Sequence, residues 1–473
     1  MRLIPIHIGL FGHIDHGKTA IARLLSEKIS TAGLDKHPQA QERGISIDLG
    51  FTAFNLDPYQ VTLVDAPGHA DLIRSVVAGA NIIDAAILVI AADEGPKPQT
   101  GEHILILDSF NISKALIIIN KIDLVDESGI NTVERSIKAL LKGTILEDSP
   151  VARVSAKTGE GAADIKKMLL NLLEKPVRRV EGPFKMPIDH AFHIKGAGTV
   201  MTGTVHRGKI TTGDVAEIMP LEIQGKIKSI QTFGETLQTA MAGDRVGIAI
   251  PGIQASKIHR GCYLCTPGTL SSTSQLVAHL KVNRFFKFTL APRMNVHLTV
   301  GTPTVAGVIY PFKKDDDHNI VLSQVIANQD FFAYITLNSV IVSEPGDPIL
   351  ISRLDLPATK LRIAASGKVI DSNPTSFSLN SVSTKKGTVR IQPHKEEFII
   401  DSLARSQFGA KKLIDTRVKT ASGIQGKIIT SFGGKGAVIA EFSERPKDGE
   451  SVYLKKYKKF NLIGGKSPSD RVG

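Results

Sequence analysis

The stretch of this 473-residue chain that most constrains its fold runs from Gly12 to Thr19 and reads GHIDHGKT. It matches the phosphate-binding pattern G-x-x-x-x-G-K-[ST], with a strand-like apolar run before it and a helical pattern after it. Its glycines allow backbone N–H groups to close around a phosphate at a helix N-terminus, where the helix dipole favours negative charge. We therefore expect Lys18 to reach the β and γ phosphates of a nucleotide and the Thr19 hydroxyl to ligate Mg²⁺.

Up to about residue 175 the sequence alternates strand-like apolar runs with helical patterns. The later runs cover residues 61–64, 85–91, 116–119 and 151–154, and each is followed by a polar loop and a helix candidate. This alternation predicts an α/β domain with a doubly wound parallel sheet, whose ligand lies at the carboxyl ends of its strands. The nucleotide motifs of the chain all fall at such ends.

Two motifs that follow the phosphate loop carry carboxylates. Asp65 opens DAPGH, where the carboxylate can hold Mg²⁺ through water and the Gly68 N–H can sense a γ phosphate. Asn120, Lys121 and Asp123 belong to NKID. The Asp123 carboxylate can accept from guanine N1–H and from the exocyclic amine, a pair that adenine lacks, while the stem of Lys121 lies along the base.

The last motif is SAK, formed by Ser155, Ala156 and Lys157 after the strand-like run that ends at Val154. It is expected to offer a backbone N–H to the guanine O6. Each short string is a weak signal alone. Four of them in this order, each after a strand, indicate a GTPase that binds GTP or GDP with Mg²⁺.

Positive charge is concentrated near the end of the sequence. Residues 371–473 carry 19 Lys and Arg against 10 Asp and Glu, an excess of +9 out of +12 for the whole chain. Such a region favours a polyanionic partner, most simply RNA, although a solvated surface of the same charge would give the same pattern. No apolar run reaches the ~18 residues of a membrane span, and the first apolar stretch is no signal peptide, so we expect a soluble, cytoplasmic protein without a membrane partner.

Beyond about residue 175 the helical patterns largely stop, and short β-rich runs broken by glycine follow. This pattern predicts small barrels. We expect a P-loop GTPase domain at residues 1–179, β-barrel domains at residues 180–270 and 271–370, and a basic β-rich domain at residues 371–473.

The two cysteines, Cys262 and Cys265, lie in GCYLC within the first expected barrel. A single C-x-x-C pair gives no disulfide framework and supplies at most half a zinc site. We therefore interpret both as strand residues and assign no metal to them.

The nucleotide motifs, together with RGISID at residues 43–48, resemble those of the translational GTPases related to elongation factor Tu, and the resemblance covers about the first 370 residues. It implies that Ser46, where the family usually has threonine, closes on Mg²⁺ and the γ phosphate. It also implies that His69 orients or stabilises the attacking water. Ile14 and Ile45 match the apolar gate that holds this histidine away until the ribosome triggers it.

In the phosphate loop, Asp15 and His16 are expected to shape the loop near the phosphates. The expected Mg²⁺ ligands are Thr19, Ser46 and Asp65. The expected nucleotide-binding residues are Asp15, His16, Gly17, Lys18, Thr19, Ala20, Gly68, Asn120, Lys121, Asp123, Ser155, Ala156 and Lys157.

Within this group, RGISID, DAPGHADLI, the barrel string FKMPIDHAFHIKGAGTVMTGTV and the extra basic domain resemble the SelB-type selenocysteine-specific elongation factors in their archaeal or eukaryotic form. The resemblance implies an aminoacyl pocket in the first barrel at Asp189, His190 and Arg245. Arg245 would supply permanent charge to the selenolate, His190 would donate a hydrogen bond, and Asp189 would orient either. Bacterial relatives have arginine where His190 stands. An ordinary barrel salt bridge between Arg245 and Asp189 is the alternative interpretation.

The resemblance implies a translation elongation factor that delivers selenocysteyl-tRNA to the ribosome at recoded UGA codons, with ribosome-triggered GTP hydrolysis. Two alternatives stay open: a general aminoacyl- or initiator-tRNA carrier, and an RNA- or ribosome-binding regulatory GTPase in which the basic domain dominates. The expected partners are selenocysteyl-tRNA and the ribosome. Recoding RNA, its adaptor protein and the long variable arm of the tRNA stay open as partners of the last domain, and a monomer is the family expectation.

Overall fold

The computed structural model describes residues 3–25, 28–29, 50–65, 83–315, 318–357, 360–392 and 397–462. The chain divides into two compact units. Unit 1 comprises Met1–Pro311 and Gln324–Thr375, and unit 2 comprises Phe312–Ser323 and Ser376–Gly473. No helix among the described residues is both long enough and apolar enough to cross a membrane.

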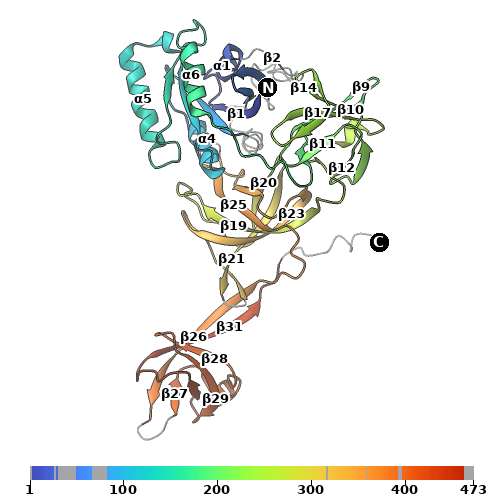
Figure 1. The fold of residues 1–473 in the computed structure, drawn as a ribbon. Coiled ribbons are helices and arrows are strands. Elements are labelled where there is room, and N and C mark those ends of the chain that lie inside the picture. Colours follow the sequence, from blue (N-terminus) through green and yellow to red (C-terminus); the bar gives the residue numbers. More distant parts are fainter. Residues whose placement is uncertain are drawn as a thin grey trace. The chain divides into compact units, whose positions relative to one another are not determined.

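Unit 1 begins with a seven-stranded sheet in the order β2-β3-β4-β1-β5-β6-β7 (Figure 1). Strands β4, β1, β5, β6 and β7 pair in parallel, whereas β2, β3 and β4 pair antiparallel at one edge. The strands are β1 (Ile4–Gly12), β2 (Lys28–Ile29), β3 (Gly50–Leu56), β4 (Tyr59–Asp65), β5 (Ala85–Ala91), β6 (Ala115–Asn120) and β7 (Val151–Arg153).

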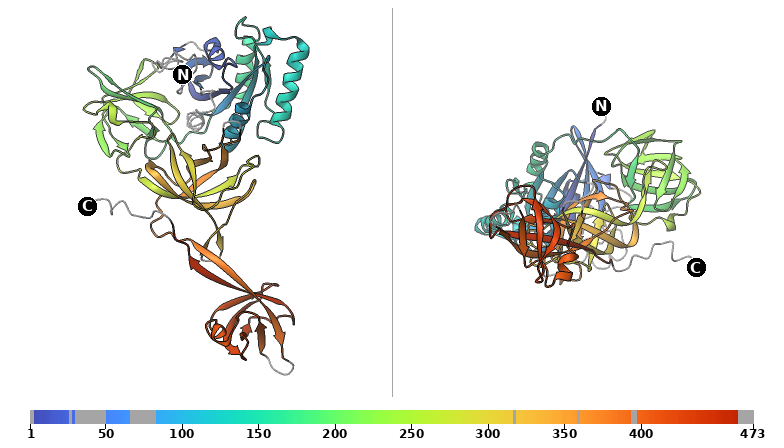
Figure 2. Two further views of the ribbon diagram at one scale, coloured as in Figure 1. Left: turned by 180° about the vertical axis from the view of Figure 1, so that it is seen from behind. Right: turned by 90° about the horizontal axis from the view of Figure 1, so that it is seen from below.

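Helices cover both faces of this sheet (Figure 2). Helices α4 and α5 share one apolar core with β5 and β6, and α1 and α6 share the opposite core with β1 and β4. Because both faces of the sheet are covered, β5 (AAILVIA) and β6 (ALIIIN) are buried along their whole length. All their residues are apolar except Asn120, which ends β6. The helices are α1 (Lys18–Leu25), α4 (Pro98–Ser109), α5 (Glu127–Leu141) and α6 (Ala162–Leu172), with a 3₁₀ turn at Ile122–Leu124. The α/β fold predicted for this part is confirmed.

The next part of unit 1 contains sheets in the orders β15-β14-β17-β10-β9, β13-β12-β18-β8 and β11-β16, packed around one apolar core. A short 3₁₀ turn, Ala255–Lys257, precedes its last strand. The strands are β8 (Lys185–Pro187), β9 (His190–Ile194), β10 (Gly198–Thr204), β11 (Lys209–Thr211), β12 (Val215–Met219), β13 (Ile223–Lys226), β14 (Ser229–Thr232), β15 (Glu235–Leu237), β16 (Thr239–Met241), β17 (Arg245–Ile250) and β18 (Tyr263–Cys265).

The last part of unit 1 is a barrel of six strands in the order β20-β24-β25-β19-β23-β21, closed by the pairing of β20 with β21. Its strands are β19 (Ser272–Val282), β20 (Met294–Val300), β21 (Thr304–Asp315), β23 (Asp330–Val342), β24 (Pro348–Ser352) and β25 (Ile363–Asp371). The last four residues of β21 belong to unit 2. β-Barrel domains following the GTPase domain are thus confirmed.

Unit 2 is a second closed ring of six strands in the order β26-β27-β30-β29-β28-β31, in which β31 pairs with β26 (Figure 2, red). Its elements are β22 (His318–Val321), β26 (Asn380–Ile391), β27 (Phe398–Asp401), α7 (Gln407–Lys411), β28 (Arg417–Thr420), β29 (Gln425–Phe432), β30 (Ala437–Phe442) and β31 (Ser451–Lys459). The sequence did not indicate that residues 312–323, from within the preceding barrel, belong to this unit. The domain boundaries at residues 179, 270 and 370 stay predictions.

Candidate functional site

The phosphate loop joins the carboxyl end of β1 to α1. Gly12, Asp15 and Gly17 in this loop have positive φ angles of 141°, 61° and 89°. A Cβ atom on Gly12 would meet the Val89 carbonyl oxygen at 2.3 Å, and one on Gly17 would meet Asn120 Nδ2 at 2.2 Å. Conformation and space therefore both require glycine at these two positions, as a close backbone cradle for phosphate does.

Lys18 begins α1 and is buried. Its Nζ donates to the His13 carbonyl oxygen at 2.9 Å, so the ammonium lies against the loop where phosphates are expected. Thr19 and Ala20 follow in the first turn of the helix. Ile14, the predicted gate residue in this loop, is half-buried.

Asn120 connects the phosphate loop to the SAK segment. It ends β6 and is 2% exposed. Its Nδ2 donates to the His16 carbonyl oxygen at 3.0 Å, and its Oδ1 accepts from the Ala156 N–H at 3.0 Å. One side chain thus fixes two predicted nucleotide-binding segments that lie far apart in the sequence.

The other NKID and SAK residues meet beside this link. The Ser155 hydroxyl donates to Asp123 Oδ1 at 2.6 Å. Lys121 has a positive φ of 63°, and its ammonium lies 3.6 Å from an Asp93 carboxylate oxygen. Lys157 is exposed. The structure therefore brings the predicted guanine-binding residues together. The hydrogen bond from Ser155 uses Oδ1 of Asp123 and does not involve Oδ2.

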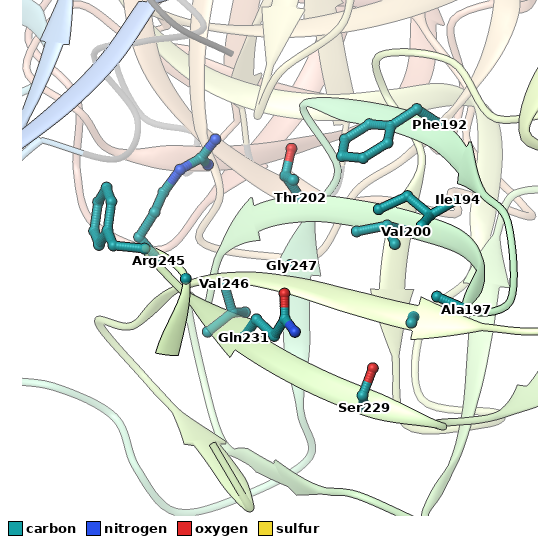
Figure 3. A pocket seen from close by; sticks show the side chains of 13 residues that line it. Phe192, Ile194, Ala197, Val200, Thr202, Ser229, Gln231, Arg245, Val246 and Gly247 are labelled. Carbon is teal, nitrogen blue, oxygen red and sulfur yellow. The ribbon is translucent and has the colours of Figure 1, made fainter. Parts of the chain in front are cut away.

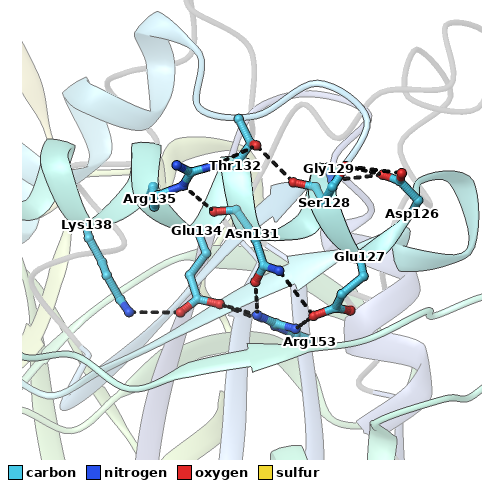
Figure 4. A network of polar contacts seen from close by, with 10 residues as sticks. All are labelled: Asp126, Glu127, Ser128, Gly129, Asn131, Thr132, Glu134, Arg135, Lys138 and Arg153. Atoms are coloured by element: carbon cyan, nitrogen blue, oxygen red, sulfur yellow. Dashed lines mark hydrogen bonds and ion pairs between the residues drawn. The ribbon is translucent and has the colours of Figure 1, made fainter.

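A polar network holds α5 against the end of β7, two residues before Ser155 (Figure 4). Arg153 ends β7 and donates to Glu127 at 2.6 Å and to both Asn131 and Glu134 at 2.8 Å. The bond from Arg153 is the main cause that lowers the pKa of Glu134. This network fixes the strand end from which the SAK segment leaves.

A histidine on α4 supports the phosphate loop and was not predicted. His103 Nδ1 accepts from the Gly12 N–H at 3.2 Å. Burial, and next the charge of Lys18, lower the pKa of His103 to about 3, so the neutral imidazole carries its proton on Nε2. A single histidine in a helical pattern gives no signal of this role in the sequence.

Some predicted residues lie outside the described part of the chain. They are Ile45, Ser46, Gly68, His69 and the side chain of Asp65. Among the expected Mg²⁺ ligands, only Thr19 has a described side chain. Within the described ranges no group of three or more His, Cys, Asp or Glu could hold a metal ion.

Two of the three predicted aminoacyl residues, Asp189 and Arg245, meet at the start of β17. Arg245 begins this strand, is buried, and pairs through Nη1 with Asp189 Oδ2, which is also buried. The guanidinium carbon lies 3.5 Å from the centroid of the Phe51 ring on β3, so the arginine stacks on the GTPase domain. Phe51 could not be predicted from the sequence, because its contact with Arg245 joins residues from two domains.

Arg245 also lines a cavity of about 690 Å³ on the sheet of β9, β10, β14 and β17 (Figure 3). Figure 3 shows Arg245 and Thr202 near one end, and Phe192 and Val200 along the wall. The Thr202 hydroxyl oxygen is buried and has no hydrogen-bond partner among the described residues. His190 lies directly opposite Thr202 in the β9–β10 ladder. The cavity thus combines apolar side chains with a few polar groups, Arg245 and Thr202 near one end and Gln231 and Ser229 on β14, an arrangement typical of ligand sites.

The two cysteines are free and buried. Cys265 ends β18, and Cys262 lies one residue before this strand. Burial raises the pKa of both thiols, that of Cys265 to about 12, so both are protonated at neutral pH.

Family models match three parts of the chain. The elongation factor Tu GTP-binding domain matches residues 5–175, and elongation factor Tu domain 2 matches residues 198–265. Domain III of the archaeal selenocysteine-specific elongation factor matches residues 270–373.

Whole proteins match as well. The selenocysteine-specific elongation factor of Methanocaldococcus jannaschii is 44% identical, over 97% of this chain and 99% of that protein. The mouse protein of the same name is 38% identical, over 65% of this chain and 56% of its own length. The crystal structure of translation elongation factor SelB from Methanococcus maripaludis with the GTP analogue GPPNHP is 41% identical and has a TM-score of 0.81, covering 98% of this chain and all of that one.

Proposed function

Because this chain belongs to the family of selenocysteine-specific elongation factors, we propose that it carries selenocysteyl-tRNA in its GTP state and delivers it to the ribosome at recoded UGA codons. Its GTPase domain hydrolyses GTP to GDP and phosphate. Hydrolysis would release the switch segments and with them the tRNA. The full-length similarity favours this specialised carrier over a general aminoacyl- or initiator-tRNA carrier.

The nucleotide part of the proposal rests on the described loop. The glycine cradle would accept the phosphates, the Lys18 ammonium would neutralise them, and Asp123 would select guanine. Asn120 would hold the phosphate and base segments at a fixed spacing. Bound Mg²⁺ would neutralise phosphate charge, and we propose Thr19, Ser46 and Asp65 as the residues that hold it.

The same proposal assigns the hydrolytic step to His69. This side chain would orient the attacking water, and Ile14 and Ile45 would keep it away from the γ phosphate until the ribosome binds. Phosphoryl transfer needs positioning and charge stabilisation more than covalent chemistry from the protein, which suits this role.

The observation that carries the aminoacyl specificity is the buried Arg245 at the rim of the cavity in the first barrel. Arg245 also forms a salt bridge with Asp189, as the alternative interpretation of these two residues expects. This salt bridge uses the Nη1 nitrogen of the guanidinium. A guanidinium has five N–H donors, so others are available to an anion in the cavity. The position of Arg245 on the cavity wall favours the pocket over a purely structural salt bridge.

The chemistry of the cargo fits this position. A selenol is more acidic than a thiol, so the side chain of selenocysteine is largely an anion at neutral pH. A fixed cation with little water around it attracts such an anion more strongly than it attracts a neutral hydroxyl. If serine were bound in place of selenocysteine, the buried polar groups of the pocket would be badly paired, at a cost of about 1–3 kcal/mol each.

The experiment that tests the proposal is protection of the aminoacyl ester from hydrolysis. We would compare selenocysteyl-tRNA and seryl-tRNA on the same tRNA body, with a GTP analogue and with GDP. Protection of the selenocysteyl ester alone, and only with the GTP analogue, is expected. Equal protection of both esters would leave a tRNA carrier without selenolate recognition, and no protection of either would favour a regulatory GTPase.

Further partners belong to the same proposal. We expect the carrier to act as a monomer in the cytoplasm, where ribosomes and charged tRNA meet. Recoding RNA, an adaptor protein and the long variable arm of the tRNA are the candidate partners of the C-terminal domain, whose basic charge suits RNA.

A further inference from the structure

The outer face of unit 2 carries a tyrosine between two lysines. Tyr453 of β31 pairs with Lys386 of β26 on one side and with Lys419 of β28 on the other. Directly opposed residues in antiparallel strands have Cβ atoms about 4.5–5.5 Å apart. We call these three residues the basic row.

The basic row points away from the core of the barrel. The neighbours Val452, Leu454 and Val418 are buried in the apolar core of unit 2. Side chains alternate along a strand, so Tyr453 and Lys419 must face outward. Tyr453 is 37% exposed, so part of its ring is accessible to a partner.

Among the described residues, other basic side chains of this unit pair with acidic ones, whereas the two lysines of the row do not. Elsewhere in this unit Lys427 pairs with Asp415 at 2.9 Å and Arg390 pairs with Asp401 at 2.9 Å. Within the described residues, neither lysine of the row takes part in an ion pair. Arg417, exposed and two residues before Lys419 on the same strand face, extends the positive charge.

We propose that the basic row binds an unpaired segment of RNA, with one base stacked on Tyr453 and the flanking phosphates held by Lys386 and Lys419. Stacking on an aromatic ring together with backbone contacts to basic side chains is how proteins hold single strands. A duplex keeps its bases stacked inside and cannot use the ring. An acidic peptide would use the lysines but would have no use for the exposed ring between them.

The test measures binding of a fluorescein-labelled, mixed-sequence, single-stranded RNA of about 12 nucleotides to the full chain with GDP, by fluorescence anisotropy. Tyr453→Ala is expected to weaken binding roughly tenfold, with the salt dependence kept. Tyr453→Phe should bind like the parent protein because the ring remains. The double variant Lys386→Ala, Lys419→Ala should bind more weakly and show a shallower salt dependence.

The control is the double variant Lys411→Ala, Lys435→Ala, which removes two exposed lysines on α7 and in the β29–β30 turn. It should bind as the parent protein does. Equal binding by Tyr453→Ala and the parent protein would overturn the proposal, as would equal losses in the two lysine double variants. Competition by an acidic peptide as strong as that by unlabelled RNA would also overturn it. The outcome is independent of the ester-protection result, since the basic row lies in unit 2 and the proposed aminoacyl pocket in unit 1.

Discussion

Two histidines near the phosphate loop are neutral because they are buried. Burial lowers the pKa of His16 to about 4 and that of His103 to about 3. The unfolded chain has histidines with pKa values of about 6.5. Between these values the unfolded state binds more protons than the folded state, so folding stability falls as the pH falls.

Folding stability should depend on pH through His16 and His103. The free energy of unfolding should be independent of these histidines above about pH 6.5 and fall below it, by up to about 1.4 kcal/mol per pH unit for each one. His103→Gln keeps an acceptor for the Gly12 N–H but cannot titrate, so its stability should fall less steeply. Urea unfolding between about pH 7 and about pH 5 measures this, with the exposed His193→Gln as control. A slope unchanged by His103→Gln would show that His103 is not the titrating group.

His69→Ala should bind GTP as the parent protein does, while ribosome-stimulated hydrolysis falls on the order of 100-fold or more. The exposed His259→Ala serves as the matched control and should hydrolyse normally. Single-turnover hydrolysis with and without ribosomes measures the effect, and unchanged stimulation would remove His69 from the catalytic step.

Single residues were predictable where a short motif assigns them. Lys18, Asn120 and Asp123 belong to strings whose chemistry is local, and the structure brings their segments together. Phe51 and His103 could not be found this way. Their contacts to Arg245 and Gly12 come from elements distant in sequence, and nothing local in the sequence distinguishes them from core residues.

At the scale of elements, the end of β6 connects the phosphate loop to the SAK segment through Asn120. Asn120→Ala removes bonds to the His16 carbonyl and the Ala156 N–H, so the phosphate loop and the SAK segment lose their common support. Removing one buried and one partly buried hydrogen bond costs about 1–3 kcal/mol, so GDP should bind roughly tenfold more weakly or worse. Calorimetry or fluorescent nucleotide binding measures this. Asn171→Ala on the exposed side of α6 should leave the affinity unchanged, and an equally tight Asn120→Ala variant would contradict the proposed role of this junction.

The parallel elements were predictable because buried strands covered by helices are continuous apolar runs. The expected runs 61–64, 85–91, 116–119 and 151–154 coincide with β4, β5, β6 and β7 to within a few residues. The antiparallel pairing of β3 with β4 was not predicted, because strand direction depends on a turn and not on hydrophobic period. Residues 312–323 pair within unit 2 through β22 and Asn380, a long-range contact that no local pattern indicates.

At the scale of the whole molecule, a buried lysine joins the two barrels of unit 1. Lys185 Nζ lies 2.7 Å from Glu344 Oε2 and 3.3 Å from Asp347 Oδ1, and Arg207 lies 3.1 Å from the other Glu344 oxygen. Burial alone would raise the pKa of Glu344, but its bonds to Lys185 and Arg207 lower it overall. The two barrels are therefore held together by ion pairs between Lys185 and Arg207 of one barrel and Glu344 and Asp347 next to the other.

Lys185→Met should destabilise unit 1 by about 3 kcal/mol, because it leaves partly buried carboxylates without their main cation. Urea unfolding measures the change. Lys209→Met, at an exposed position of the same barrel, should change stability by less than about 0.5 kcal/mol. A Lys185→Met protein as stable as the Lys209→Met control would show that the network does not hold the barrels together.

The measurement that tests the central claim most directly is the selectivity of ester protection in Arg245 variants, with the GTP analogue bound. Arg245→Gln should lose at least about tenfold in affinity for selenocysteyl-tRNA and keep its affinity for seryl-tRNA, because only the selenolate uses the fixed charge. Arg245→Lys should lie between Arg245→Gln and the parent protein, since it keeps the charge and loses the stacking on Phe51. A selectivity ratio that is the same in Arg245→Gln as in the parent protein would contradict the claim that Arg245 recognises the selenolate.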